Sequence, residues 1–548
     1  MVLLDRPANI FASSLLECAT ARSAVLTKSE SRVALPNPIR EALTEARFCY
    51  MVEIVASRHF QEAQLLDVAS QLARIPEVVG GSVTSDAGGA PGHDPVRIGA
   101  AVRARGLTPN VHVTCVRHNR DGLLETLKTL HSLEIQNVFA MTGDFPKSKA
   151  AAAAFDLDSV QLVRMIDELR QGGIPYWIAV AVSPFKYTEA DCLYQYLKLR
   201  KKIAAGADYA ITQLGYDAGK FRELKRYLDD NVGPFPVLGN VFVLNSRAAE
   251  KMGNGEIPGC WVSPELQTIL KKESQSADKG VMARLERAAR MAAIIRGLGY
   301  AGAYLGGTHN AGHIRWIIQR AQELQPRWEE LAEELSFAPQ RAFYLYKSAA
   351  SVSSKRGIVP RVLDAMVKLF PVNKNNGLRR LLSNIFGWIY RRPSLARGAE
   401  RVEFAIKSPL FGCQACGNCV LGCMEYVCPQ TCPKQMRNGP CGGANNNGKC
   451  EVIAEQMCIW VSVYERAKAA NEVDRLSAYI PPPDRSLKGT SSWINYFLNR
   501  DARPGNFKSL VPLSATGPAA MAELEQPVKT TPAEKPDPVL LKIETGPK

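Results

Sequence analysis

Short apolar runs alternate with amphipathic segments from about residue 45 to residue 335. The intervening segments carry apolar residues at helical spacing, which predicts helices at 61–75, 120–134, 159–173, 220–232 and 313–335. The longer interval from 244 to 301 predicts an added loop and helix. The apolar runs are rich in Val, Ile, Phe and Tyr and predict eight strands, at 48–55, 78–84, 110–115, 137–143, 176–182, 209–215, 235–244 and 301–307.

Strands that alternate with helices predict an α/β fold with a parallel sheet. Eight such units favour a closed (β/α)8 barrel, a TIM barrel, over an open sheet. The chain is long enough for further domains. We therefore expect an N-terminal arm at 1–40, the barrel at 41–337, a basic helical connector at 338–405, a small cysteine-rich metal-binding domain at 406–478, and a largely disordered tail at 479–548.

Positive charge is concentrated behind the predicted barrel. Of the chain's formal net charge of +15, residues 341–410 supply +11, with 14 Lys or Arg against 3 Asp or Glu. Such a stretch is either a solvated connector or a surface for an acidic partner, and no nucleic-acid motif accompanies it. The amphipathic segment 377–393 either packs against the barrel or lies on a membrane surface.

The sequence contains no apolar run long enough to span a membrane and no secretory signal at its N-terminus. We therefore expect a cytoplasmic protein. In a reducing cytoplasm, clustered cysteines more often hold metal than form disulfides. The 14 cysteines of this chain are therefore expected to be reduced.

Polar residues lie where the predicted strands end, which is where barrel enzymes carry their active sites. A carboxyl group within an apolar strand, such as that of Glu53, could keep its proton near neutral pH and act as a general acid. An ordinary hydrogen-bonded glutamate, a core histidine at His112 and a simple turn at Gly143 are the plainer alternatives. The positions at the predicted strand ends are Glu53, Thr84, His112, Thr114, Thr142, Gly143, Asp144, Ser183, Thr212 and Gln213.

Three ordered motifs resemble the methylenetetrahydrofolate reductase family: HVTC at 112–115, NVFAMTGD at 137–144 and AGADYAITQ at 205–213. The resemblance implies a barrel that binds FAD, with FMN as an alternative. It also implies NAD(P)H as a donor and the interconversion of 5,10-methylenetetrahydrofolate and 5-methyltetrahydrofolate. It covers about residues 45–320.

The resemblance also implies roles for single residues. Glu53 would protonate a folate nitrogen, Asp144 would face the flavin and the pterin, and Gln213 would contact the folate. Tyr187 stands near a usual FAD-contacting histidine, and Lys202 stands where a basic residue faces the FAD phosphates. Stretches 183–190 and 306–310 depart from the family pattern and put the nicotinamide and folate-tail contacts in doubt. The positions expected to line the flavin are Thr84, His112, Thr142 and Gly143.

Nine cysteines lie within residues 413–458, and the first four follow the C-x2-C-x2-C-x3-C spacing of bacterial ferredoxins. Iron–sulfur clusters, structural zinc and a metal-free thiol cluster are all compatible with the spacing. Segment 432–443 resembles the C-terminal domain of a methylenetetrahydrofolate reductase subtype. The expected metal ligands are Cys413, Cys416, Cys419, Cys423, Cys428, Cys432, Cys441 and Cys450, with Cys458 to spare.

These features favour a flavin-dependent oxidoreductase of one-carbon metabolism. The alternatives are a non-catalytic scaffold that binds a pterin or a partner, and a methyl-transfer component with a zinc–thiolate site. A ferredoxin-like electron carrier could replace NAD(P)H, and turnover with such a carrier would then depend strongly on salt. The direction of the reaction and a homo-oligomeric state are left open.

Overall fold

The computed structural model describes residues 36–57, 61–85, 92–147, 153–347, 357–369 and 376–501. The described residues from Ile39 onward belong to one compact unit. The arm predicted at 1–40 lies almost wholly outside the described residues, and so does the predicted tail beyond residue 501.

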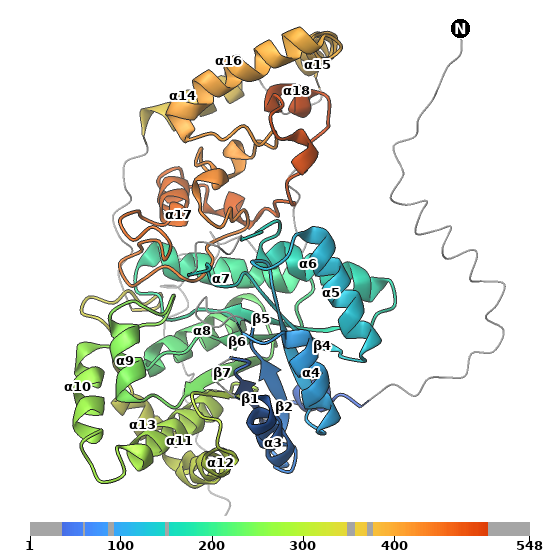
Figure 1. The fold of residues 1–548 in the computed structure, drawn as a ribbon. Coiled ribbons are helices and arrows are strands. Elements are labelled where there is room, and N and C mark those ends of the chain that lie inside the picture. Colours follow the sequence, from blue (N-terminus) through green and yellow to red (C-terminus); the bar gives the residue numbers. More distant parts are fainter. Residues whose placement is uncertain are drawn as a thin grey trace, which may run out of the picture. The chain divides into compact units, whose positions relative to one another are not determined.

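Eight parallel strands close into a barrel in sequence order, which confirms the predicted (β/α)8 fold (Figure 1). The first and last strands complete the ring, with Tyr50 opposite Ala303 and Val52 opposite Leu305. The strands are β1 (Cys49–Ile54), β2 (Val78–Val83), β3 (Pro109–Thr114), β4 (Asn137–Met141), β5 (Trp177–Val182), β6 (Tyr209–Thr212), β7 (Val237–Phe242) and β8 (Gly302–Gly306).

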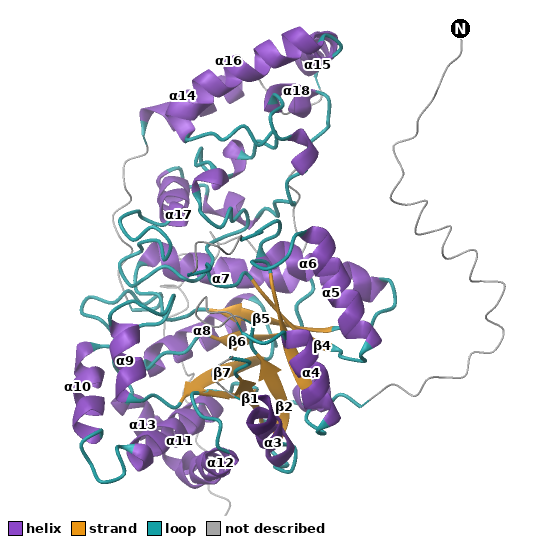
Figure 2. Ribbon diagram, viewed as in Figure 1, coloured by secondary structure: helices purple, strands orange, loops and turns teal. Residues whose placement is uncertain are grey.

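Helices cover the outside of the strands (Figure 2). Side chains from alternate strand positions fill two cores, because successive residues of a strand point to opposite faces. Met51, Phe139 and Tyr304 belong to one core, whereas Val52 and Val138 belong to the larger core that includes helix residues. The helices that follow the strands are α3 (Glu62–Leu72), α4 (Pro95–Ala104), α5 (Arg120–Ser132), α6 (Ser159–Gln171), α7 (Glu189–Ala204), α8 (Ala218–Asn231), α11 (Val281–Gly297) and α12 (Ala311–Leu324).

Four further helices depart from the simple repeat. A short helix, α2 (Pro38–Thr44), precedes β1. The predicted insertion between 244 and 301 contains α9 (Ser246–Gly253) and α10 (Pro264–Glu273). The helix predicted at 313–335 is interrupted by the 3-10 turn η2 (Gln325–Arg327) and resumes as α13 (Trp328–Glu334), because proline at 326 cannot donate a helical hydrogen bond.

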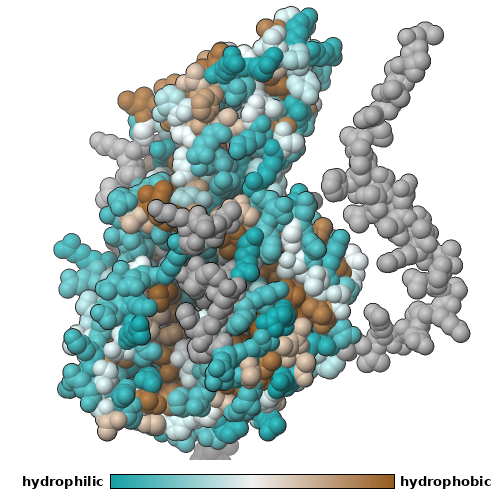
Figure 3. Space-filling view, in the orientation of Figure 1, coloured by the Kyte–Doolittle hydropathy of each residue, from teal (hydrophilic) through white to brown (hydrophobic). Residues whose placement is uncertain are grey.

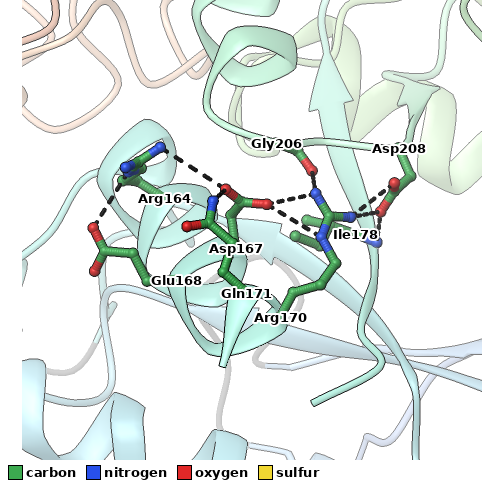
Figure 4. Close-up of polar contacts among 8 residues, drawn as sticks. All are labelled: Arg164, Asp167, Glu168, Arg170, Gln171, Ile178, Gly206 and Asp208. Carbon is green, nitrogen blue, oxygen red and sulfur yellow. Dashed lines mark hydrogen bonds and ion pairs between the residues drawn. The ribbon is translucent and has the colours of Figure 1, made fainter. Parts of the chain in front are cut away.

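An arginine at the end of α6 ties that helix to the start of β6 (Figure 4). Arg170 donates to both carboxyl oxygens of Asp208, at 2.9 and 2.8 Å, and to the carbonyl oxygen of Gly206 at 2.9 Å. It also pairs with Asp167 at 2.6 Å. This network lies at the beginning of β6, opposite the strand ends, so the first half of the AGADYAITQ motif stabilises the barrel.

Behind the barrel, the chain forms helices and short turns. The helices are α14 (Ile358–Leu369), α15 (Gly377–Tyr390), α16 (Pro393–Phe411), α17 (Ile459–Ala469) and α18 (Ser492–Phe497), and the 3-10 turns are η3 (Leu421–Cys423), η4 (Pro429–Thr431), η5 (Val473–Ser477) and η6 (Arg485–Leu487). Trp460 of α17 packs edge-on against Tyr194 of α7, with ring centroids 4.9 Å apart. Residues 479–501, the start of the predicted tail, instead include η6 and α18, which packs on α15 and α16.

Candidate functional site at the barrel mouth

Glu53 lies on β1, one residue before the strand ends. Only a minor part of its surface is exposed, and burial raises the pKa of its carboxyl group to about 7, against a lowering effect of the backbone hydrogen bond from Gly307. A side chain at Gly306 would lie 2.8 Å from the Glu53 carboxyl oxygen, so glycine on β8 leaves room for this carboxyl group. The structure thus provides a carboxylic acid that stays protonated to about neutral pH.

His112 lies inside the barrel in a hydrogen-bonded row with its neighbours. Its Nε2 atom is 2.9 Å from the Ser82 hydroxyl, which also accepts from Asn110 Nδ2 at 3.2 Å. The ring packs edge-on against Phe139, with centroids 4.8 Å apart. Burial lowers the pKa of His112 to about 3, so the imidazole is neutral and does not act as a cationic acid near neutral pH.

The segment after β4 depends on a glycine. Gly143 has φ +86°, a left-handed conformation that favours glycine, and a Cβ atom there would lie 2.6 Å from Val116. Thr142 is buried beside it, and Asp144 follows at an intermediate position. The turn therefore directs Asp144 out of the strand end, where its charge acts on Cys260 and Lys434.

Two of the remaining predicted residues, Gln213 and Thr84, directly follow strands, and a third, Tyr187, does not. Gln213 follows β6 directly, and Thr84 follows β2, where its hydroxyl accepts from the Ala56 amide at 3.2 Å. Tyr187 is buried and hydrogen-bonded to Asp217, whose charge, after burial, raises the pKa of the phenol. Tyr187 is thus committed to a contact with α8 rather than open to a ligand through its hydroxyl group.

Lys202 is buried on the inner face of α7 and donates to the carbonyl oxygen of Ala181 at 2.6 Å. Burial, together with the charge of Lys198, lowers its pKa to about 7. Lys198 donates to the carbonyl oxygens of Gly439 and Pro440, at 3.2 and 2.8 Å. These buried ammonium groups are suited to an anion such as a phosphate.

Several buried polar atoms near the strand ends have no hydrogen-bond partner within the part of the chain that the structure describes. They include the hydroxyl groups of Thr114, at the end of β3, and Ser183, directly after β5, and Asn240 Oδ1 on β7. Buried polar groups are costly unless they are satisfied. This part of the barrel therefore fits a polar ligand such as the edge of a flavin ring. Sequence reasoning did not identify Asn240.

The cysteine-rich region contacts the barrel at these strand ends. Lys434 donates to the carbonyl oxygen of Gly143 at 2.7 Å, and Thr142 donates to the Met436 sulfur at 3.9 Å. At the N-cap of α6, a carboxyl oxygen of Asp158 accepts from the backbone amides of Arg437 and Asn438, at 3.2 and 2.9 Å. Segment 432–443, singled out from the sequence, is therefore one of the parts that join the two domains.

A cleft opens between the barrel loops and residues 443–454. Cys260 lines it, and burial, then the charges of Asp144 and Glu53, raise the pKa of its thiol to about 12. Cys260 therefore lies within electrostatic range of both predicted catalytic carboxyl groups. Sequence reasoning missed it because a lone cysteine in a loop carries no pattern.

Four cysteines surround each of two cavities in the cysteine-rich region. The first is lined by Cys413, Cys416, Cys419 and Cys428 and by α16 residues that include Phe404. The second is lined by Cys432, Cys441, Cys450 and Cys458. We call these the first and second four-cysteine sites. Cys423 lines neither cavity, and burial raises its pKa while Lys201 and Arg475 act against that effect.

A repeated hydrogen bond distinguishes most cysteines of these sites. The backbone N–H two residues further along donates to the sulfur, as from Gly443 to Cys441 at 3.5 Å and from Val452 to Cys450 at 3.4 Å. Such bonds favour thiolates, the form that binds metal. The same contact is made to Cys413, Cys428, Cys432 and Cys458, where it opposes burial, which raises the pKa of each thiol.

Buried cations accompany both sites. Lys407 lies 3.5 Å from the Cys419 sulfur, and Arg437 is within electrostatic reach of Cys416, Cys428 and Cys419. At the second site, Cys441 raises the pKa of Lys434, against the lowering effect of burial. The surroundings thus offset the negative charge that four thiolates would carry.

A closed (β/α)8 barrel with an acid, hydroxyl groups and an amide at its strand ends defines an enzyme of the barrel class. The model of the family "Methylenetetrahydrofolate reductase" matches residues 38–297, and that of "Methylene-tetrahydrofolate reductase C terminal" matches residues 393–486. The two matches together cover more than half of the chain. The chain belongs to the methylenetetrahydrofolate reductase family and also carries the family's C-terminal domain.

Individual relatives agree with this assignment. The 5,10-methylenetetrahydrofolate reductases of Salmonella typhimurium and Escherichia coli are 28% and 26% identical over 163 residues, which is 29% of this chain and 52% of theirs. A probable methylenetetrahydrofolate reductase (NADPH) of Caenorhabditis elegans is 27% identical over 126 residues, 22% of this chain and 18% of its own. The chain thus spans about half the length of these bacterial relatives, and less of the nematode protein.

Among solved structures, an uncharacterized protein from Clostridium thermocellum, described as binding two copies of 5-methyl-5,6,7,8-tetrahydrofolic acid, is similar at 12% identity and a TM-score of 0.38. The match covers 53% of this chain and 99% of that one. The fold assignment rests on the strand pairing itself.

Proposed function

We propose that this protein is a flavin-dependent oxidoreductase that interconverts 5,10-methylenetetrahydrofolate and 5-methyltetrahydrofolate. The observation that carries the proposal is the Glu53 carboxyl group, which burial keeps protonated to about pH 7 at the carboxyl end of β1. The family match over residues 38–297 and the names of the relatives support this pair of substrates.

FAD, or FMN in its place, would supply the hydride-transfer chemistry when bound. The buried hydroxyl groups of Thr114 and Ser183 have hydrogen-bonding capacity that a polar ring edge would satisfy. Lys202 would face a phosphate, which would hold its ammonium group in the charged form. The sequence-predicted positions that would line the ring are Thr84, His112, Thr142 and Gly143.

Three side chains would act on the folate. Glu53 would donate its proton to the folate nitrogen as the one-carbon bridge opens, and it would accept that proton in the reverse reaction. The negative charge of Asp144 would stabilise the cationic iminium form of the folate. Gln213, directly after β6, would hold the pterin by its amide group.

The two four-cysteine sites are proposed to hold iron–sulfur clusters. Four cysteines line each cavity, and four cysteine thiolates are the usual ligands of a four-iron cluster. The same donors suit structural zinc, and the ferredoxin-like C-x2-C-x2-C spacing of Cys413, Cys416 and Cys419 favours iron–sulfur. The amide-to-sulfur hydrogen bonds and the buried cations further support thiolate ligands at both sites.

In this proposal the second site is the one nearer the reaction. Its segment 432–436 contacts Thr142 and Gly143 of the barrel, whereas the first site is lined by α16. Clusters held by the two four-cysteine sites would supply one-electron transfer chemistry, with the second site beside the barrel. The donor would be a ferredoxin-like carrier at the first site, or NAD(P)H at the barrel mouth.

Anaerobic purification followed by absorbance, flavin and metal measurements tests the proposal. We expect a bound flavin and about eight iron atoms per chain, as two four-iron clusters require. Zinc without iron, together with methylation of a thiol acceptor, would favour the zinc–thiolate methyl-transfer alternative. A protein that binds a pterin but no flavin would be the non-catalytic scaffold.

A further inference from the structure

Exposed apolar side chains are concentrated on three consecutive helices. In the described part of the chain, 14 of the 19 large apolar side chains that are exposed lie in α14, α15 and α16. Among them, Ile358 and Leu369 are 78% and 73% exposed. Figure 3 shows such apolar surface, in brown, among polar surface over these helices. Apolar surface on this scale marks an interaction site.

On α15, three of the four large exposed apolar residues form one stripe. Leu381, Ile385 and Trp388 follow helical spacing, and Trp388 is 53% exposed. The opposite side of the helix packs on α18, where the Phe386 and Phe497 rings stack with centroids 4.9 Å apart. The apolar stripe therefore takes no part in the packing of α15 against α18.

The other two helices repeat this arrangement. On α14, Ile358, Val362 and Met366 are exposed at intervals of four residues. On α16, which packs against α15, Val402 and Ile406 are exposed at the same spacing. Three helices with apolar stripes facing outward are typical of helices that lie on a membrane surface.

The charges on these helices are almost all positive at the surface. Arg380, Arg391 and Arg392 are exposed, and Arg392 lies over the Trp388 ring at 3.9 Å from its centroid. The acidic residues turn inward: Glu403 is buried with Lys407, and Asp364 accepts from the Tyr426 hydroxyl at 2.7 Å. Glu400 lines the first four-cysteine site.

Charge and apolar area together indicate what binds the surface formed by α14, α15 and α16. A second copy of this chain would bring the same arginines together, which is unfavourable. A transient electron carrier forms a small interface, whereas this surface is apolar across three helices. A bilayer with anionic headgroups satisfies both properties, since aliphatic and Trp side chains enter its boundary and arginines meet the lipid phosphates.

We propose that α14, α15 and α16 attach this protein to the surface of an anionic lipid bilayer. No helix among the described residues is long and apolar enough to cross a membrane, so the helices lie on the surface. Because α16 also lines the first four-cysteine site, attachment would bring that site close to the lipid headgroups. The proposal does not depend on the reaction at the barrel.

Flotation of the full chain with lipid vesicles tests this. We expect binding to vesicles in which about a third of the lipid is phosphatidylglycerol, weak binding to phosphatidylcholine alone, and weaker binding in high salt. Replacing Leu381→Asp and Trp388→Asp together should weaken binding at least about tenfold, because both side chains would leave the apolar boundary. The matched control replaces two exposed apolar residues of the barrel, Leu133→Asp and Met282→Asp, and should bind as the wild type.

Circular dichroism would establish that both double variants are folded. Wild-type protein that stays unbound with anionic vesicles, or an α15 variant that floats as well as the wild type, would overturn the proposal. Two other results would also overturn it. In the first, the wild type does not bind vesicles but forms a dimer at high concentration, and the α15 variant does not. In the second, the wild type binds an acidic protein instead of vesicles, and the α15 variant does not.

Discussion

The Lys434 ammonium group, in the cysteine-rich region, donates a hydrogen bond of 2.7 Å to the carbonyl oxygen of Gly143, at the end of barrel strand β4. Lys434 is also ion-paired with Glu451, and both side chains are almost fully buried. One lysine thus joins the wall of the second four-cysteine site to the segment that carries Asp144. The two domains are linked where the barrel's chemistry is expected.

Replacing Lys434→Met should destabilise the protein by about 3–5 kcal/mol, because Glu451 would be left buried without its cation. Urea unfolding measures the loss. The double variant Lys434→Met with Glu451→Gln should recover part of it, since the buried charge is then removed as well. Equal stability of the single variant and the wild type would contradict a buried pair at this junction.

Glu53 should make stability depend on pH in a defined window. Because its pKa in the folded protein is raised from 4.5 to about 7, the folded state keeps a proton that the unfolded state releases, so stability falls as pH rises from about 4.5 to about 7. Glu53→Gln removes this effect. The variant should gain about 3 kcal/mol relative to the wild type between those pH values, measured by urea unfolding at each end.

Two glycines with positive φ offer a matched comparison. At Gly206, φ is +117° and a Cβ atom would lie 2.6 Å from the Asp167 carboxyl carbon, whereas at Gly173, φ is +99° and nothing lies within 4 Å. Gly173→Ala should cost about 1 kcal/mol for the backbone conformation alone. Gly206→Ala should cost about 2 kcal/mol more, because it also disturbs the Arg170 network. Equal unfolding free energies would mean that the close approach to Asp167 is unimportant.

The assignment of cysteines can be tested one residue at a time. Cys428→Ser should lose about four iron atoms per chain, because Cys428 lines the first site, and Cys458→Ser should lose the second cluster in the same way. Cys423→Ser is the control and should keep all its iron, since Cys423 lines neither cavity. Loss of iron from Cys423→Ser with retention in Cys428→Ser would support the ferredoxin spacing instead.

The barrel could be predicted from sequence because each strand and helix carries its own periodic signal. Residues such as Glu53 and Gln213 could be placed because strand ends in a barrel share one face. The domain junction could not be predicted in this way. The pairing of Lys434 with Gly143, and the role of Asp158 in holding Asn438, join positions about 280 residues apart and leave no local pattern.

The sequence also did not reveal which cysteines line the same site. The spacing of Cys413, Cys416, Cys419 and Cys423 resembles a single ferredoxin run, but the turn at η3 places Cys423 against α7. Cys428 instead joins the first site, and Cys458, which the spacing leaves over, lines the second. Such grouping depends on how turns fold in three dimensions, which spacing along the chain does not specify.

The most direct measurement is the single-turnover kinetics of Glu53→Gln, with Glu265→Gln, at an exposed position on α10, as the control. The donor should still reduce the bound flavin at a rate near that of the wild type. Reoxidation by 5,10-methylenetetrahydrofolate should be slowed by about 100-fold or more, because the proton donor is missing. Reoxidation at the wild-type rate would contradict the role of Glu53 as the acid that protonates the folate at the barrel mouth.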